Sequence, residues 1–292
     1  MLKFFIGQKD GRRRARNTND IKQCDELEKI SAIAARDMNQ SERRQYLIRE
    51  LISEEPEYRN LSVPRDAGGQ KTLLRALMNV REPKACSEEF LKIQDAYLQA
   101  ETEAKGITDL ADLTPAQDGL YIWQGDITTL RCDAIVNAAN GGMTGCYVPN
   151  HRCIDNAIHS FAGIELRLEC AEIMKKQGHE EPTGHAKLTK AYNLPCKYIL
   201  HTVGPIVMGP LTEQDKNDLA SCYRSCMRLA AEHDLTSIAF CCISTGEFHF
   251  PNEEAAQIAV NTVKEEMNRK TSVKKVVFNV FKDYDREIYE KL

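Results

Sequence analysis

The sequence lacks a long hydrophobic run: no stretch of its 292 residues approaches the roughly 18 apolar residues of a membrane-spanning helix. The opening segment, Met1–Gly7, is also too short for the apolar region of a signal peptide. An excess of basic residues is missing too, since the formal net charge is −4, and this excludes a bulk electrostatic footprint for nucleic acid. We therefore expect a cytoplasmic protein without a membrane or nucleic-acid partner.

Complete disulfide pairing is excluded as well, because the chain has eleven cysteines, an odd number. In a reducing compartment most of them are expected to be core residues or metal ligands. Six lie in or beside apolar runs or on one face of a helical pattern, which favours core packing: Cys132, Cys196, Cys222, Cys226, Cys241 and Cys242. The composition that is present, 42% hydrophobic and 28% charged residues, is ordinary for a globular protein with a core.

Residues 1–106 show a helical pattern without a cluster of chemically useful side chains. Apolar residues recur on one helix face at 47–52 and again at 73–78, and Ser87 begins a further helix that Gly106 ends. The basic run at 1–20 is expected to be a flexible terminus, with nucleic-acid contact as the alternative. We predict a helical N-terminal extension packed on the domain that follows; an independent partner-binding module is the alternative.

After a linker at 107–118 the pattern changes to alternating strands and helices. Strands are predicted at 120–125, 133–139, 186–191, 198–203, 237–243 and 276–281, and helices at 154–162, 165–177, 213–233, after Pro251 and at 283–292. This alternation predicts a mixed, largely parallel sheet with helices on both faces over 119–292. Ligands of such sheets bind outside the carboxyl ends of the strands, so polar residues that follow strands are candidate site residues.

The loop after the strand at 133–139 carries the most reactive set of side chains. Asn140 and two glycines follow the strand, and the glycines allow a ligand to approach the backbone. Cys146, His151 and Cys153 then supply two thiolates and an imidazole, a ligand set that suits zinc. Three ligands leave an open position, which is typical of a catalytic zinc. The alternatives are a structural site completed by a distant Cys or His, and three unligated side chains.

Two further strand ends and one aromatic residue have possible ligand roles. Asp126 follows the first strand and either accepts a hydrogen bond from an exocyclic amine or caps a helix. The turn at 242–251 offers backbone N–H groups to phosphates, although it has neither Walker nor Rossmann spacing and a plain tight turn is the simpler interpretation. Phe281 either stacks on a purine or packs in the core. Together these features predict a cleft for a nucleotide diphosphate.

Six segments, taken jointly and in order, resemble the macrodomain family and its MacroD-type hydrolases. They are Gly-Asp-Ile-Thr at 125–128, Ile-Val-Asn-Ala-Ala-Asn at 135–140, Ile-Asp-Asn-Ala-Ile-His at 154–159, Pro-Thr-Gly-His-Ala-Lys-Leu-Thr at 182–189, Leu-Pro-Cys-Lys-Tyr-Ile-Leu-His-Thr-Val-Gly-Pro at 194–205 and Ile-Ser-Thr-Gly at 243–246. The resemblance covers about 119–292. It implies a three-layer α/β/α macrodomain with a mixed sheet and ADP-ribose as ligand.

The resemblance also implies roles for individual residues. Asp126 matches the acid that holds the adenine amine, with Ile127 beside it, and Phe281 matches the residue that stacks on adenine. Asn140 and Asp155 match the catalytic positions near the distal ribose, with Cys153 and Ile154 beside them. The diphosphate loop of the family corresponds to five consecutive residues: Ser244, Thr245, Gly246, Glu247 and Phe248.

The segment between Asn140 and Asp155 departs from the MacroD pattern, in which this position holds a run of glycines. A cysteine–histidine loop after a helical extension resembles instead the zinc-containing microbial branch of the family. The resemblance therefore implies a Zn²⁺ cofactor bound by Cys146, His151 and Cys153. His159, His185 and His201, which have the chemistry of bases, are interpreted as structural histidines.

The function implied by this resemblance is hydrolysis of ADP-ribose from a mono-ADP-ribosylated protein, through an ester at an acidic side chain. The branch is associated with a sirtuin-type ADP-ribosyltransferase that modifies a lipoyl-carrier protein, which implies such a protein as substrate. Two alternatives use the same cleft: a non-catalytic ADP-ribose reader with structural zinc, and an O-acetyl-ADP-ribose deacetylase. A zinc-dependent nucleic-acid module fits poorly with the net charge of −4.

Overall fold

The structure, a computed structural model, describes residues 37–292, so the basic run at 1–20 lies outside the described residues. Its first part consists of the helices α2 (Gln40–Glu54), α3 (Ala67–Val80) and α4 (Glu88–Lys105), with a 3-10 turn η1 (Pro56–Tyr58) after α2. The side chain of Ser87 accepts a hydrogen bond from Phe90 N and so caps α4, and Gly106, at φ 89°, ends it. The helices expected from the pattern between 41 and 105 are therefore present.

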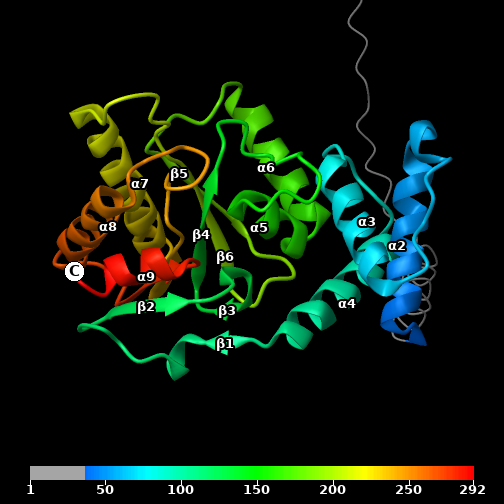
Figure 1. The fold of residues 1–292 in the computed structure, drawn as a ribbon, viewed down its shortest axis with the longest axis horizontal. Helices are drawn as coiled ribbons and strands as arrows, with labels where there is room; N and C mark the ends of the chain where they lie inside the picture. Colours follow the sequence, from blue (N-terminus) through cyan, green and yellow to red (C-terminus); the bar gives the residue numbers. More distant parts are fainter. Residues whose placement is uncertain (1–36) are drawn as a thin grey trace, which may run out of the picture.

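The segment at 107–118 has some regular structure of its own. It contains the short strand β1 (Thr108–Asp109), which pairs in parallel with β3 (Leu130–Arg131), and a 3-10 turn η2 (Leu110–Asp112). Figure 1 shows this segment running beneath the sheet from α4 toward β2. The chain thus crosses from the helical part to the sheet through an ordered connection.

The central element is a six-stranded sheet. Its spatial order is β2 (Leu120–Gln124), β8 (Lys275–Val280), β7 (Ser237–Phe240), β4 (Ala134–Ala139), β6 (Tyr198–Val203) and β5 (Ala186–Lys190). All neighbouring pairs are parallel except β5 and β6, which are antiparallel, so the sheet is mixed. The central strand β4 is buried on both faces, as its apolar run predicts. The carboxyl ends of five strands therefore lie along one edge.

Helices cover both faces of this sheet (Figure 1). The pair α5 (Ile154–Ala162) and α6 (Ile164–Gln177) lies on one side, and the pair α7 (Glu213–Glu232) and α8 (Asn252–Met267) lies on the other. A last helix, α9 (Asp283–Tyr289), packs on β2 and β8. The predicted three-layer fold with a mixed sheet is confirmed. Within residues 37–292 no helix combines the length and the apolar character needed to cross a bilayer.

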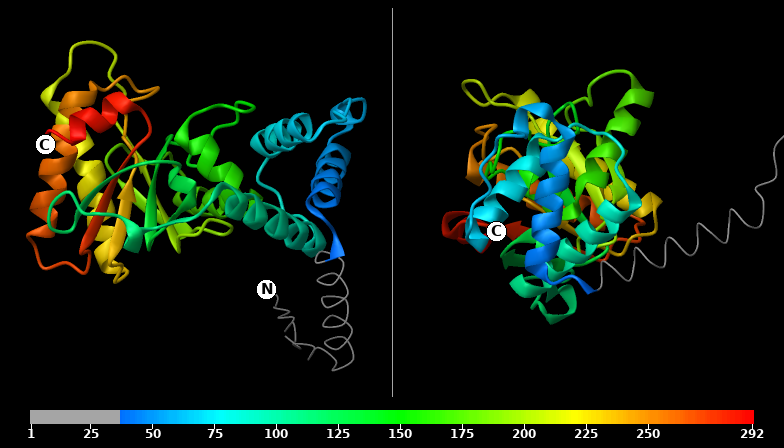
Figure 2. Two further views of the ribbon diagram at one scale, coloured as in Figure 1. Left: turned by 60° about the horizontal axis from the view of Figure 1, so that its bottom comes forward. Right: turned by 90° about the vertical axis from the view of Figure 1, so that its right-hand side faces the viewer.

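Two apolar cores stabilise the molecule. The larger one surrounds the sheet and includes the six cysteines assigned to packing, of which Cys242 lies at its margin. The smaller one lies between α2, α3 and α4 and also takes Ile164 from α6. Figure 2 shows the three helices standing beside the sheet domain, with α4 extending into it. Because a fully buried isoleucine contributes about 1.5–3 kcal/mol, Ile164 attaches the three helices to α6 by an amount of this order.

Candidate active site

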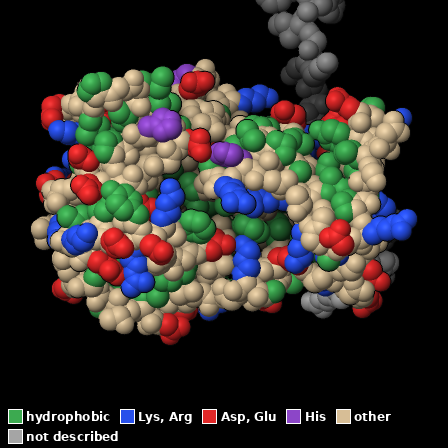
Figure 3. Space-filling model, viewed as in Figure 1, with side chains coloured by type: hydrophobic (Ala, Val, Ile, Leu, Met, Phe, Trp, Pro, Cys, Tyr) green, Lys and Arg blue, Asp and Glu red, His purple; other side chains and the backbone are tan. Residues whose placement is uncertain are grey.

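The predicted site residues gather at the carboxyl edge of the sheet. Asp126 follows β2, Asn140 follows β4, the turn at 244–248 follows β7, and Phe281 follows β8. Phe281 is 78% exposed, so the core-packing alternative for this residue is wrong. On the face seen in Figure 3 the surface is hollowed near its centre, with hydrophobic side chains at the floor and Lys and Arg side chains beside it.

Asp126 uses its two carboxylate oxygens differently. Oδ1 accepts hydrogen bonds from the backbone N (3.0 Å) and hydroxyl (2.6 Å) of Thr128 and so caps the 3-10 turn η3 (Ile127–Thr129). Oδ2 faces the surface and pairs with Lys105 Nζ at 3.0 Å. Burial alone would raise the pKa of Asp126, but the bonds from Thr128 and Lys105 outweigh it and lower the pKa. The residue is therefore both a cap and an exposed anionic acceptor, with buried Ile127 beside it.

Cys146, His151 and Cys153 converge as the sequence predicts. Their ligand atoms all lie within 4.8 Å of one another, and Cys146 Sγ lies 3.7 Å from His151 Nδ1. Burial raises the pKa of Cys153 to about 12, so this side chain is a thiol until a cation stabilises its thiolate. Two sulfurs and one imidazole, half-buried and close together, fit a zinc ion with one coordination position left open.

The catalytic pair predicted from the family is held together by direct contacts. Asp155, buried in the first turn of α5, accepts a hydrogen bond from Asn140 Nδ2 at Oδ2 (3.3 Å) and one from Asn137 Nδ2 at Oδ1 (2.8 Å). Asn140 is oriented by Gly142 N, which donates to its Oδ1 at 3.0 Å. Burial raises the pKa of Asp155 to about 6, against the lowering effects of Asn137 and of the Arg167 charge. The carboxylate thus lies behind Asn140.

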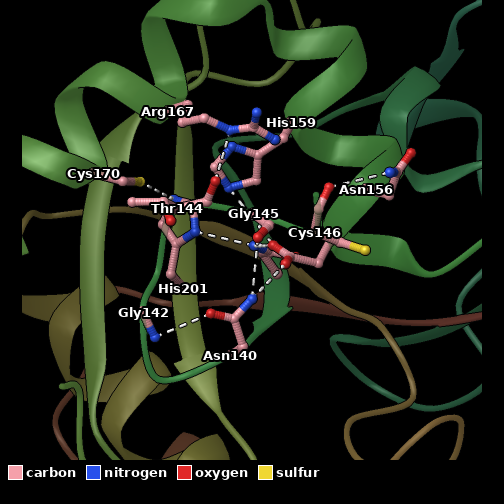
Figure 4. Close-up of polar contacts among 12 residues, drawn as sticks. Asn140, Gly142, Thr144, Gly145, Cys146, Asn156, His159, Arg167, Cys170 and His201 are labelled. Carbon is pink, nitrogen blue, oxygen red and sulfur yellow. Dashed lines mark hydrogen bonds and ion pairs between the residues drawn. The ribbon is translucent and has the colours of Figure 1, made fainter. Parts of the chain in front are cut away.

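A second polar network supports this pair from inside the fold (Figure 4). Asn137 donates both to Asp155 and to His201 Nδ1 (3.1 Å). His201 Nδ1 is therefore the acceptor, and its Nε2 carries the proton and donates to Thr189 Oγ1 at 2.9 Å. Burial lowers the pKa of His201 to about 3, so this ring is neutral. His201 consequently orients Asn137, as expected of a structural histidine.

His159, Cys170 and His201 form a further cluster of buried side chains whose ligand atoms lie within 4.8 Å of one another. Both nitrogens of His201 are already used by Asn137 and by a threonine hydroxyl, which leaves it no lone pair for a metal. Burial, with the charges of His201 and Arg167, lowers the pKa of His159 well below its usual value. We therefore interpret this cluster as part of the packing behind Asp155. His185, in contrast, is exposed.

The turn after β7 has the geometry of an anion cradle. Ser244 has a left-handed backbone at φ 64°, and its carbonyl accepts from Phe250 N at 3.0 Å, which closes the turn. Within residues 37–292, the backbone N–H groups of 244–248 donate to no protein acceptor, so they are free for phosphate oxygens. Gly204 touches Ser244 so closely that a β-carbon there would collide with its hydroxyl. Of the five turn residues, Gly246 and Glu247 are exposed, and Thr245 and Phe248 are half-buried.

One contact joins the loop that carries Cys146, His151 and Cys153 to the turn at 244–248. His151 directs Nδ1 toward Cys146, and its Nε2 lies 3.7 Å from Glu247 Oε1. A carboxylate on the far nitrogen of a metal-binding histidine orients the ring and raises its basicity. Glu247 is 70% exposed, so this contact contributes little stability on its own. The geometry nevertheless places the Cys–His cluster beside the turn at 244–248.

Several residues of the site were missed by sequence reasoning. Lys105 of α4 faces Asp126, and Arg75 of α3 donates to His151 O and to Asn156, but both belong to a helical part that carries no motif. Helical periodicity shows that such residues lie on one face of a helix, not what that face contacts. Asn137 itself was not missed, because it belongs to the motif at 135–140; its bond to His201, which links two different strands, has no local signal.

Comparison with known proteins identifies the family. The macro domain model matches residues 136–259. A Treponema medium protein named protein-ADP-ribose hydrolase is 58% identical over 259 residues, which cover 87% of this chain and 99% of the Treponema chain. A Fusarium oxysporum f. sp. cubense protein named probable bifunctional ADP-ribose hydrolase/ADP-ribosyltransferase is 39% identical over 240 residues, which cover 75% of this chain and 40% of the Fusarium chain. The Trypanosoma brucei macrodomain in complex with ADP-ribose has a TM-score of 0.58 and 29% identity, over 74% of this chain and 94% of that one. With its fold, its motifs and a relative matched over nearly its whole length, this chain belongs to the macrodomain family.

Proposed function

We propose that this protein is an ADP-ribosylhydrolase that binds ADP-ribose and releases it from a mono-ADP-ribosylated protein. The observation that carries the proposal is that the bonded pair Asn140 and Asp155 flanks the loop that holds the Cys146–His151–Cys153 cluster, and that His151 of this loop lies beside Glu247 of the turn at 244–248. The names of the Treponema relative and of the Trypanosoma structure support this substrate class.

The proposed binding mode follows the strand edge. Asp126 Oδ2 accepts the adenine amine, and exposed Phe281 stacks on the base. The free N–H groups of the turn at 244–248 bind the diphosphate. The distal ribose then lies against Asn140 and the Cys–His loop. Binding energy from the nucleotide part is thereby used to position the bond that breaks.

The proposed reaction is hydrolysis of an ester between an acidic side chain and the distal ribose. Water supplies the hydroxyl group and the proton, and the products are free ADP-ribose and the free carboxylic acid. Asn140 and Asp155 orient the ribose and the water, because their amide and carboxylate are already held in place by Gly142 and Asn137. Cys146, His151 and Cys153 would hold a zinc ion, whose chemistry at this position is that of a Lewis acid.

The biological setting we propose is reversal of an ADP-ribosyltransferase of the sirtuin type, with a lipoyl-carrier protein as the modified substrate. The Fusarium relative named as a bifunctional hydrolase and ADP-ribosyltransferase supports the pairing of the two activities. The sirtuin type and the carrier protein rest on the resemblance to the zinc-containing branch alone.

The deciding experiment incubates protein of known zinc content with a substrate mono-ADP-ribosylated on an aspartate or glutamate, and measures free ADP-ribose. We expect release by the native protein and loss of release in Cys153→Ala. Binding without release would instead indicate an ADP-ribose reader, and faster turnover of O-acetyl-ADP-ribose would indicate a deacetylase. Full activity in protein shown to lack metal would remove zinc from the mechanism.

A further inference from the structure

The loop that carries the Cys–His cluster is poorly supported by its own backbone. Between residues 144 and 152 the described structure holds a single backbone–backbone hydrogen bond, from His151 N to Val148 O at 3.2 Å. Asn150 has a left-handed backbone at φ 55°, a turn conformation that asparagine adopts more readily than most residues with a side chain. Such a loop needs external support to keep two sulfurs and an imidazole together.

That support comes from helix α3 of the N-terminal extension. Arg75 donates a hydrogen bond from Nη2 to His151 O (3.1 Å). It also donates two hydrogen bonds to Asn156 Oδ1, from Nη2 (2.8 Å) and from Nε (3.2 Å). One turn later, Asn79 Oδ1 accepts from Asn150 N at 2.9 Å, and its Nδ2 donates to Ser160 Oγ at 2.8 Å. Helix α3 therefore holds the backbone of two consecutive loop residues, one of which is the histidine of the cluster.

Asn156 passes this support on to the other side of the loop. Its Nδ2 donates to Cys146 O (3.3 Å) and to Val148 O (3.0 Å), while its Oδ1 is fixed by Arg75. Its backbone N donates to Cys153 Sγ at 3.4 Å. Each of the three proposed ligands is thus contacted by Arg75 or by the asparagine that Arg75 orients.

Arg167 of α6 joins α3 to the start of the loop. Its Nη1 donates to three carbonyls at the end of α3, those of Met78 (3.2 Å), Asn79 (2.6 Å) and Arg81 (2.7 Å). Its Nε donates to Thr144 O at 2.7 Å. Figure 4 shows Arg167 above the loop and Asn156 beside Cys146. A buried cation at a helix C-terminus is favourable, so α3 is held where its side chains reach the loop.

We propose that helix α3 is a structural part of the metal site and that Arg75 is the positioning residue through which it keeps the three ligands together. This inference rests on the proposed function for the identity of the metal, but the contacts themselves do not. It assigns a role to the helical extension, into which the match with the Treponema relative also reaches, since that match covers 87% of this chain. The extension is then required by the active site rather than serving as a separate module.

The test compares two substitutions in α3 of the full chain. Arg75→Met keeps an unbranched side chain but loses all donors to the loop. Lys71→Ala, one turn earlier, is the matched control, because Lys71 pairs with Glu101 at 2.6 Å and is 49% exposed. We measure the rate at which a colorimetric chelator removes zinc, together with amide hydrogen exchange over 144–153. Loss of groups that orient metal ligands typically weakens metal binding about 10–100-fold, so we expect zinc release at least about tenfold faster in Arg75→Met and unchanged in Lys71→Ala.

The outcomes separate this inference from the zinc assignment. Equal zinc release and equal loop exchange in the two variants would overturn the role of Arg75, even if Cys153→Ala loses zinc. If the native protein binds no zinc, the zinc assignment fails, and the role of α3 is decided by exchange: faster exchange of Asn150 and its neighbours in Arg75→Met supports it, and equal exchange refutes it. Should Arg75→Met not fold, Arg75→Lys keeps the charge without the fork, and wild-type release and exchange in that variant would refute the proposal.

Discussion

The proposed binding mode is tested most directly at Asp126, the proposed acceptor for the adenine amine. The change is Asp126→Asn, which keeps the size of the side chain. Its remaining oxygen can still accept from Thr128 N and from the Thr128 hydroxyl, so the cap on η3 persists. The group that replaces Oδ2 is an amide NH₂, which faces the adenine amine as a second donor. The substitution therefore removes Oδ2, the proposed acceptor for the adenine amine, and keeps the local fold around η3 unchanged.

The size of the effect follows from the single bond that is lost. A hydrogen bond to a charged group contributes about 1.5–3 kcal/mol, and about 1.4 kcal/mol corresponds to a tenfold change in Kd. We expect Asp126→Asn to bind ADP-ribose roughly 10–150-fold more weakly. The stability cost is small, because the pair with Lys105 joins side chains that are 32% and 41% exposed and contributes at most about 1 kcal/mol.

Calorimetry with two ligands separates this role from a general loss of affinity. ADP-ribose carries the exocyclic amine, and its inosine analogue carries an oxygen there. The native protein should prefer ADP-ribose, and Asp126→Asn should lose most of that preference. Lys105→Met is the control, because it removes the neighbouring cation but keeps the carboxylate. An unchanged ratio of the two affinities in Asp126→Asn would show that the carboxylate does not read the amine.

Three further predictions concern chemistry and stability. Asp155→Asn should lower the single-turnover rate by about 100-fold or more while ADP-ribose binding changes little, and native turnover would exclude a catalytic role. Asp133→Asn should lower the free energy of unfolding by about 2 kcal/mol in urea titrations at neutral pH, because the carboxylate accepts bonds from Lys197 and Thr236. Those bonds outweigh burial and depress the pKa of Asp133, so the difference should shrink as pH falls below about 4. Burial lowers the pKa of His201 to about 3 while the unfolded residue titrates near about 6.5, so stability should fall between those pH values on acidification, and less steeply in His201→Gln.

Much of the fold was predictable because its signals are local. A strand buried on both faces has a continuous apolar run, as Ala134–Ala139 shows, and alternation of strands with helices implies a parallel arrangement. The position of the site followed from the same signals, since ligands bind at the carboxyl ends of such strands. The convergence of Cys146, His151 and Cys153 was predictable because the three residues lie within eight positions of one loop.

Other features had no local signal. The exposure of Phe281 depends on β8 ending at Val280, one residue earlier than predicted. The buried carboxylate of Asp155 is held by Asn137, which lies 18 residues away on β4. The contacts of Arg75 with His151 in the loop and with Asn156 in α5 span 76 and 81 residues. Pattern analysis assigns a residue to a face of its own helix, and it contains no information about which distant backbone that face will meet.

The sequence by itself therefore determined the family, the order of the elements and the chemical identity of the groups along the strand edge, because motifs and periodicity are properties of short segments. Only the tertiary structure decided how those groups are held: Asp155 behind Asn140, His151 between Cys146 and Glu247, and the whole loop against α3. The physical reason is that a loop with a single internal hydrogen bond takes its shape from the surfaces around it, and those surfaces come from distant parts of the chain.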